Sequence, residues 1–90
     1  MDKREKLLRF LELPLTVGEE LPDVSLVGNG HFTLRGRQRL IFCSEEKIIF
    51  STVCGRLAVM GSGLFIASIL SGETCVEGRI EKIGYLNGEL

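Results

Sequence analysis

The chain has 90 residues, of which 44% are hydrophobic and 26% are charged, and its 11 Lys and Arg nearly balance its 12 Asp and Glu. This composition is typical of one small globular domain and excludes the collagenous, coiled-coil and intrinsically disordered classes. The formal net charge of -1 also argues against nucleic acid as a partner, because domains that neutralise phosphates carry a large positive excess.

Residues 2–11 predict a short amphipathic helix at the N-terminus. Asp2 and Glu5 have the spacing of a capping box, and Pro14 ends the helical pattern. A helix of about three turns is marginal in water, so its apolar side is expected to dock on its own sheet, on a partner protein or on a membrane surface. The apolar side consists of Leu7, Leu8, Phe10 and Leu11.

The segment 1–11 is also basic, since four Lys and Arg against two acids give a sum of +2, while the rest of the chain sums to -3. A basic amphipathic helix can lie at an anionic membrane surface, and packing on its own sheet is an equally good reading. The charged run from Asp2 to Lys6 is followed by only two leucines, too few for the apolar core of a signal peptide. We therefore expect a cytoplasmic protein, at most peripheral to a membrane.

The remainder of the chain divides into a connector and a β domain. Residues 12–22 hold both prolines and show no sustained period, whereas from Asp23 onward short strand-like runs are broken by turns rich in Gly, Ser and Asn. We therefore expect an N-terminal helix and Pro-containing connector over 1–22 and a single β domain over 23–90. The predicted strands span 24–27, 31–35, 37–43, 47–53, 56–60, 64–70 and 74–86.

The predicted fold class is mainly β: a short N-terminal amphipathic helix followed by about seven short antiparallel strands that form a sandwich or roll. Gly61-Ser62-Gly63 predicts the tight turn of a buried hairpin, because glycine readily adopts positive φ. The runs 48–50 and 64–70 are apolar at both parities, which predicts central strands covered on two sides. The parity of the apolar residues reverses after Ile80, which predicts a β-bulge near Lys82.

Sequence patterns for catalysis and metal binding are missing. No glycine-rich turn continues into the Lys-Ser or Lys-Thr of a P-loop. The cysteines, Cys43, Cys54 and Cys75, stand 11 and 21 residues apart beside a single histidine, which is too sparse for a zinc site. Because they lie in apolar stretches, we expect them to be buried, free and inert. The sequence therefore predicts no catalytic residue, no metal, no cofactor and no enzymatic activity.

One basic cluster lies outside the N-terminus, around the turn at Gly36. Its arginines could hold an anion or a phosphate, because guanidinium groups form charge-assisted hydrogen bonds with such ligands. Arginines around a turn also serve as solubilising charge that protects a sheet edge, and both readings stay open. The cluster consists of His31, Arg35, Arg37 and Arg39.

The order of turn glycines and core positions resembles the YqfC/YabP family of bacterial sporulation proteins, and the N-terminal part is most similar to the YqfC branch. The resemblance covers nearly the whole chain. It is carried by the N-terminal helix and by Leu13-Pro14, Leu21-Pro22, Val24-x-Leu26-x-Gly28, Gly55-x-Leu57-x-Val59-x-Gly61-x-x-Leu64 and Val76-Glu77-Gly78-x-Ile80-x-x-Ile83-x-Tyr85.

The resemblance implies a non-enzymatic protein of the mother cell of an endospore-forming bacterium, with a membrane-embedded sporulation protein as its partner. On this basis we expect a small interaction module. It would bind that partner, or a second copy of itself, through the apolar side of the N-terminal helix or through an exposed sheet edge. The alternative is a small β domain that binds an anionic ligand through Arg35, Arg37 and Arg39.

Overall fold

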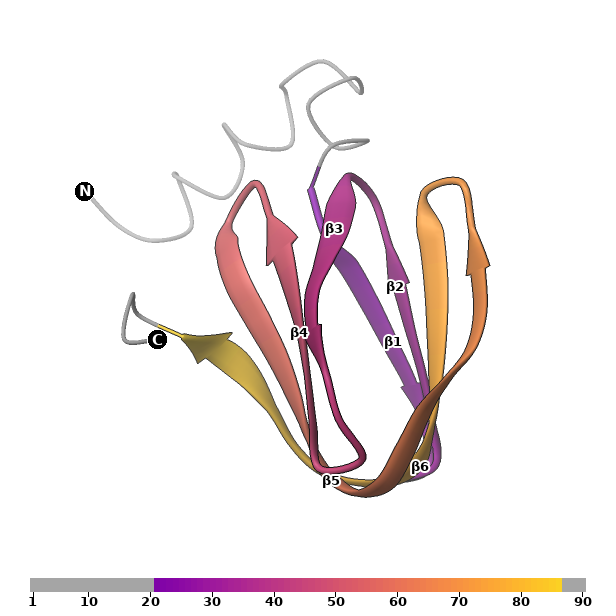
Figure 1. Cartoon of the computed structure of the whole chain (residues 1–90). Helices are drawn as coiled ribbons and strands as arrows, with labels where there is room; N and C mark the ends of the chain where they lie inside the picture. The colour runs from indigo at the N-terminus through magenta and orange to yellow at the C-terminus, as the bar shows by residue number, and fades with distance from the viewer. Residues whose placement is uncertain (1–20, 87–90) are drawn as a thin grey trace, which may run out of the picture.

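The computed structural model describes residues 21–86, which form one antiparallel sheet of six strands (Figure 1). The spatial order of the strands is β1-β2-β6-β5-β4-β3, so β1 and β3 are the edges of the sheet. The strands are β1 (Asp23–Val27), β2 (His31–Arg35), β3 (Gln38–Cys43), β4 (Lys47–Thr52), β5 (Gly55–Leu70) and β6 (Glu73–Leu86). The mainly β prediction is confirmed, and the predicted N-terminal helix lies outside the described residues.

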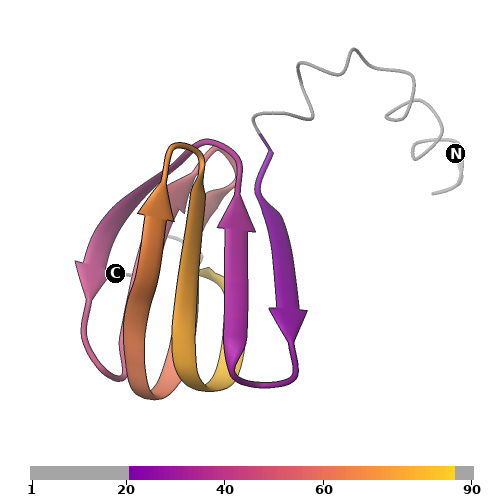
Figure 2. The ribbon, with the colours of Figure 1, turned by 90° about the vertical axis from the view of Figure 1, so that its right-hand side faces the viewer.

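The sheet folds because its two longest strands bend. β5 has 16 residues and β6 has 14, and both bend at mid-length, at the bottom of Figure 1. The first part of β5 pairs with β4, whereas the first part of β6 pairs with β2. The bend therefore separates a β2 half (β1, β2, the start of β6 and the end of β5) from a β4 half (β3, β4, the start of β5 and the end of β6). Figure 2 shows the β2 half in front of the β4 half.

The hydrophobic core lies between the two halves. The rings of Phe32 in β2 and Phe50 in β4 stack with their centroids 6.4 Å apart. Cross-strand partners point to the same side of a sheet, so the rows that contain these rings also bring Val76 and Leu57 into the core. The buried cluster consists of Phe32, Leu34, Ile48, Phe50, Leu57, Val59, Leu64, Val76 and Ile80. The alternation of Phe32 and Leu34 with polar residues, and of Leu57 and Val59 with Arg56 and Ala58, predicts the inward sides of β2 and of the start of β5, and both predictions are confirmed. In β4 the whole apolar run 48–50 is buried.

Glycines and bulges produce the bend. Gly78 has a φ of 128°, and a Cβ there would lie 2.5 Å from the carbonyl oxygen of Gly63, so only glycine fits. The register of β5 against β6 shifts at three places, one of which leaves Glu81 without a partner beside Lys82. The predicted bulge near Lys82 is therefore confirmed. Turns at the bend satisfy N–H groups of both long strands, since Leu64 donates to the carbonyl of Glu45 and Ile80 to that of Asn29 at 2.8 Å each.

The prediction of about seven strands is wrong, because residues 56–60 and 64–70 belong to the single strand β5. Gly61-Ser62-Gly63 does not reverse the chain. Glycine permits a bulge as well as a turn, and here the positive φ of Gly63 and the close approach of Arg79 to Gly61 serve the bend. The end of β5 is also not covered on two sides, since Phe65, Ile69 and Leu70 are exposed.

Candidate functional site

The structure divides the predicted cluster of His31, Arg35, Arg37 and Arg39 between two places. His31 and Arg35 lie on the outward side of the β2 half and face acids of β6. The Nδ1 atom of His31 lies 3.1 Å from Glu77, and the guanidinium of Arg35 lies 3.5 Å from Glu73. Each pair is formed by directly opposite residues of β2 and β6. Both side chains are thus matched by carboxylates, so they offer little to an external anion.

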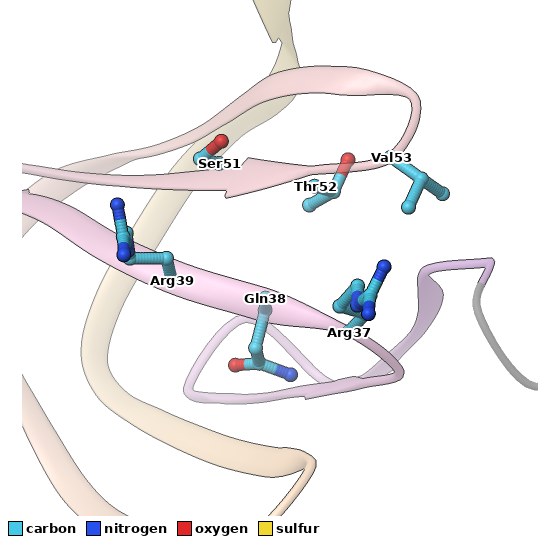
Figure 3. Close-up of a pocket in the computed structure, with 6 residues that line it drawn as sticks. All are labelled: Arg37, Gln38, Arg39, Ser51, Thr52 and Val53. Atoms are coloured by element: carbon cyan, nitrogen blue, oxygen red, sulfur yellow. The ribbon is translucent and has the colours of Figure 1, made fainter.

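Arg37 lies in the bend just before β3 and Arg39 lies in β3, and both point to the side opposite to Gln38 (Figure 3). They line an open hollow of about 370 Å³ together with Ser51, Thr52 and others. The Thr52 hydroxyl is already engaged, because it donates to the carbonyl of Gly55 at 2.8 Å and accepts the N–H of Cys54. The donors left for an anion are therefore two guanidinium groups and the Ser51 hydroxyl.

Gln38 points inward from the same segment and ties β3 to the turn before it. Its amide nitrogen donates to the carbonyls of Leu34, at 2.8 Å, and Gly36, at 3.1 Å. Its amide oxygen is buried and has no hydrogen-bond partner among the described residues. We assign Gln38 a structural role, because its amide nitrogen donates both hydrogen bonds to backbone carbonyls of the preceding turn.

The strand register reveals a larger basic surface that the sequence prediction missed. In the β4 half, Arg39 lies opposite Ser51, which lies opposite Arg56, so these three share the outward side. A second outward row joins Lys47, Met60 and Lys82. We call this surface the basic face and define it by Arg39, Lys47, Arg56 and Lys82. Their positions span more than 40 residues of sequence, so only the register brings them together.

No acid occupies the outward rows of the basic face, and none of its four cations forms an ion pair with another described residue. The nearest acids along the chain are Glu45 and Glu46, in the β3–β4 turn, and Glu81, whose carboxylate lies 4.0 Å from Arg79. The outward side of the β2 half differs, because it contains Asp23, Glu73 and Glu77.

The predicted burial of the cysteines is wrong for two of the three. Cys43 and Cys54 are exposed, in the edge strand β3 and in the β4–β5 turn, while Cys75 is half-buried and lies 3.6 Å from the Thr33 hydroxyl. Within residues 21–86 no three His, Cys, Asp or Glu side chains gather in a way that could hold a metal ion. The described cysteines also form no disulfide with one another.

The first and last strands of the sheet order, β1 and β3, differ in regularity. β1 pairs with β2 through an unbroken register of five residues, whereas β3 contains a shift between Leu40 and Phe42. Val24 and Leu26 occupy core-facing rows of β1 but are 39% and 46% exposed.

The other predicted binding surface, formed by Leu7, Leu8, Phe10 and Leu11, lies outside the described residues. Over residues 21–86 we find no helix with the length and hydropathy of a membrane span.

Sequence comparisons place these features in a family. Residues 19–90 match the YabP family, so the match includes all six strands. The chain is also similar to the uncharacterized protein YqfC of Bacillus subtilis (strain 168), with 30% identity over 80 residues that cover 89% of this chain and 86% of that protein. The match over most of the chain, together with the identity to YqfC, shows that the chain belongs to the YabP family.

Proposed function

We propose that this chain is a non-enzymatic interaction module of spore formation, and that it binds an extended segment of a protein partner along the outer edge of β1. Membership of the YabP family supports the sporulation setting. The proposed location is the mother-cell cytoplasm, and the proposed partner is a membrane-embedded sporulation protein. A second copy of the chain is the competing occupant of the same edge.

The outer edge of β1, which pairs with no other described strand, is the observation that carries this proposal. A regular edge strand presents a row of backbone N–H and C=O groups, and another strand can pair with them. β1 has no bulge, proline, lysine or arginine, which are the features that commonly protect an edge. Its core-facing residues Val24 and Leu26 are partly exposed, so an added strand would also gain apolar contacts.

The register of β1 defines the kind of segment that fits. Val24 and Leu26 face the core side, so alternate residues of the added strand should be apolar and cover them. Asp23 faces outward at the beginning of β1, beside Arg35 of the neighbouring strand. A cation on the outward side of the partner strand next to Asp23 would form a favourable cross-strand pair.

A matched pair of variants tests the proposal, because Leu40 in β3 is also core-facing, lies in the other edge strand and is 38% exposed. The full chain is purified from sporulating cells as wild type, Leu26→Arg and Leu40→Arg, and thermal melting confirms that each variant folds. We expect Leu26→Arg to lose the partner and Leu40→Arg to keep it. In the wild-type complex, hydrogen exchange should slow at the amides of β1 and stay unchanged in β3.

Retention of the partner by a folded Leu26→Arg variant would contradict the proposal. So would slower exchange in β3 rather than β1. Light scattering on the same samples identifies self-association, because a dimer that disappears in Leu26→Arg would assign the edge to a second copy.

A second candidate function is anion binding by Arg37 and Arg39, which is favoured by their position in one open hollow. This candidate is placed at Arg37 and Arg39 rather than at His31 and Arg35, because acids of β6 face the latter two. A ligand that binds the folded state raises the melting temperature. Stabilisation by phosphate that disappears in Arg37→Gln and persists in Arg35→Gln would support the site, and no stabilisation of the wild type would exclude it.

A further inference from the structure

An apolar strip runs through the middle of the basic face. Phe42, Ile49, Ala58 and Gly84 are successive cross-strand partners and form an outward row across β3, β4, β5 and β6. The row with Arg39 and Arg56 lies on one side of this strip, and the row with Lys47 and Lys82 lies on the other. Phe42 is 50% exposed at the β3 end of this row, whereas Ile49 and Ala58 are 2% and 0% exposed. Cations therefore lie on both sides of a row whose accessible apolar part is its β3 end.

The strip contains a hollow of about 400 Å³, lined by Ile41, Phe42, Lys47, Ile49 and Arg56. Ile49 is only 2% exposed, whereas Ile41 and Phe42 are 41% and 50% exposed at the edge of the sheet. Long Lys and Arg side chains can cover apolar surface with their stems while their charged ends stay in water. The hollow thus combines apolar contact with positive charge at its rim.

We propose that the basic face binds the surface of an anionic phospholipid bilayer, with Ile41 and Phe42 entering the interface and the four cations contacting headgroup phosphates. A bilayer surface offers phosphates and apolar chains side by side, which matches cationic rows around an apolar strip. None of the four cations is fixed by an acid of the described residues, so together they suit a diffuse, multivalent anion better than a single small one.

The opposite side of the molecule supports this orientation. The outward rows of the β2 half contain Asp23, Glu73 and Glu77 against Arg35 and His31, so an anionic bilayer would repel that side. A nucleic acid fits the basic face less well, because the face has Phe42 as its one described aromatic ring and thus no stacking platform. The edge of β1 belongs to the other half of the sheet, so this proposal does not depend on strand addition there.

Vesicle flotation with the full chain tests the proposal. Vesicles of phosphatidylcholine are compared with vesicles of phosphatidylcholine and phosphatidylglycerol in equal parts. We expect binding to the anionic vesicles alone, with affinity that falls as salt is added. Each cation near an anionic surface contributes about fivefold in affinity, so the double variant Arg39→Gln, Arg56→Gln should bind about 30-fold more weakly.

Two controls separate the basic face from general charge and from the N-terminal segment. The double variant Arg35→Gln, Arg79→Gln removes the same charge elsewhere and should bind as the wild type does. Phe10→Asp with Leu11→Asp tests the predicted N-terminal helix. Phe42→Ser leaves the charge unchanged and should weaken binding to vesicles but not to polyglutamate, since only the bilayer accepts an apolar side chain.

The proposal is wrong if the wild type does not float with anionic vesicles, or if both arginine pairs lower binding equally. It is also wrong if Phe10→Asp with Leu11→Asp abolishes binding while Arg39→Gln with Arg56→Gln leaves it intact. If Phe42→Ser has no effect and a single-stranded oligonucleotide or polyglutamate binds more tightly than vesicles, the face recognises an acidic polymer and not a bilayer. The Leu26→Arg variant should float normally, which distinguishes this surface from the edge of β1.

Discussion

In the β2 half of the sheet the charged side chains are matched across strands, whereas in the β4 half four cations share the outward surface without an acid in the same rows. Ion pairs between exposed residues contribute little to stability, typically about 0–1 kcal/mol, but their opposite charges cancel and leave the surface with a small net charge. Unmatched cations lower stability through mutual repulsion and create a field that attracts anions. On the outward surface of the β2 half, the charges are therefore paired with one another. On the outward surface of the β4 half, the cations are available to an anionic partner.

The largest expected effect comes from separating the two halves. Phe32 and Phe50 join them through their stacked rings, so Phe32→Ala should lower the free energy of unfolding by about 3–5 kcal/mol in chemical denaturation. Phe65→Ala is the matched control, because Phe65 points outward and is 52% exposed; its cost should stay below about 1 kcal/mol. Equal losses for the two variants would contradict the assignment of the core.

The second-largest loss of stability is expected from a substitution in the bend between the halves. Gly78→Ala places a Cβ against Gly63 and Leu64 in a backbone of positive φ, so we expect a loss of about 3 kcal/mol in unfolding free energy. Gly84→Ala changes the same strand at a site with open space and no positive φ, and should cost less than about 1 kcal/mol. A neutral Gly78→Ala would show that the two halves meet differently.

Neutralising one charge on the outward side of each half should change stability by a smaller amount, with a loss in the β2 half and no loss or a small gain in the β4 half. Glu77→Gln removes the carboxylate that faces His31 and should cost up to about 1 kcal/mol. Arg39→Gln removes one of four like charges and should leave stability unchanged or raise it by a few tenths of a kcal/mol, about the size of surface charge effects. Thermal melts at low salt measure both, and a loss in Arg39→Gln larger than in Glu77→Gln would reverse the comparison.

The smallest expected effect is a pH dependence from Tyr85, in the last strand of the β4 half. Partial burial, and then the nearby Cys54, raise the pKa of the Tyr85 hydroxyl above its usual value. A pKa raised in the folded state gives stability that is present below the unfolded value of about 10 and is lost as the pH rises through the folded pKa. Tyr85→Phe should therefore lose less stability than the wild type when melting is followed from neutral pH to above pH 10; an identical decline would contradict this.

The sequence predicted the elements that depend on local patterns. Alternation placed Phe32, Leu34, Leu57 and Val59 inside, and the reversed parity after Ile80 located the bulge beside Lys82. It failed at Gly61-Ser62-Gly63, because glycine allows a reversal and a bend equally, and the choice depends on the close approach of Arg79 from another part of the chain. The prediction that the run 64–70 is covered on two sides fails for a similar reason. The burial of a strand depends on its neighbours, and this part of β5 pairs with β6 but with no other described strand.

The candidate site shows the same limit more strongly. His31, Arg35, Arg37 and Arg39 are close in sequence, yet the strand change at Gly36 sends two of them to acids of β6 and two to an open hollow. Conversely, Arg56 and Lys82 join Arg39 and Lys47 only through the pairing of β4, β5 and β6. The one local signal for the basic face was that these cations have the parity opposite to core residues; their common surface required the register.

The shared long hairpin has a consequence for the way the chain folds. β5 and β6 are joined by a short turn at Gly72, so they can pair early with little loss of chain entropy. β2 must instead find β6 from far along the chain, as His31 and Glu77 are separated by 46 positions. We therefore expect the β5–β6 hairpin and its neighbour β4 to form the folding nucleus, with the β1–β2 hairpin docking late and opening first under stress. If the β1 edge opens first, a partner strand bound along it would also dissociate and be replaced most readily.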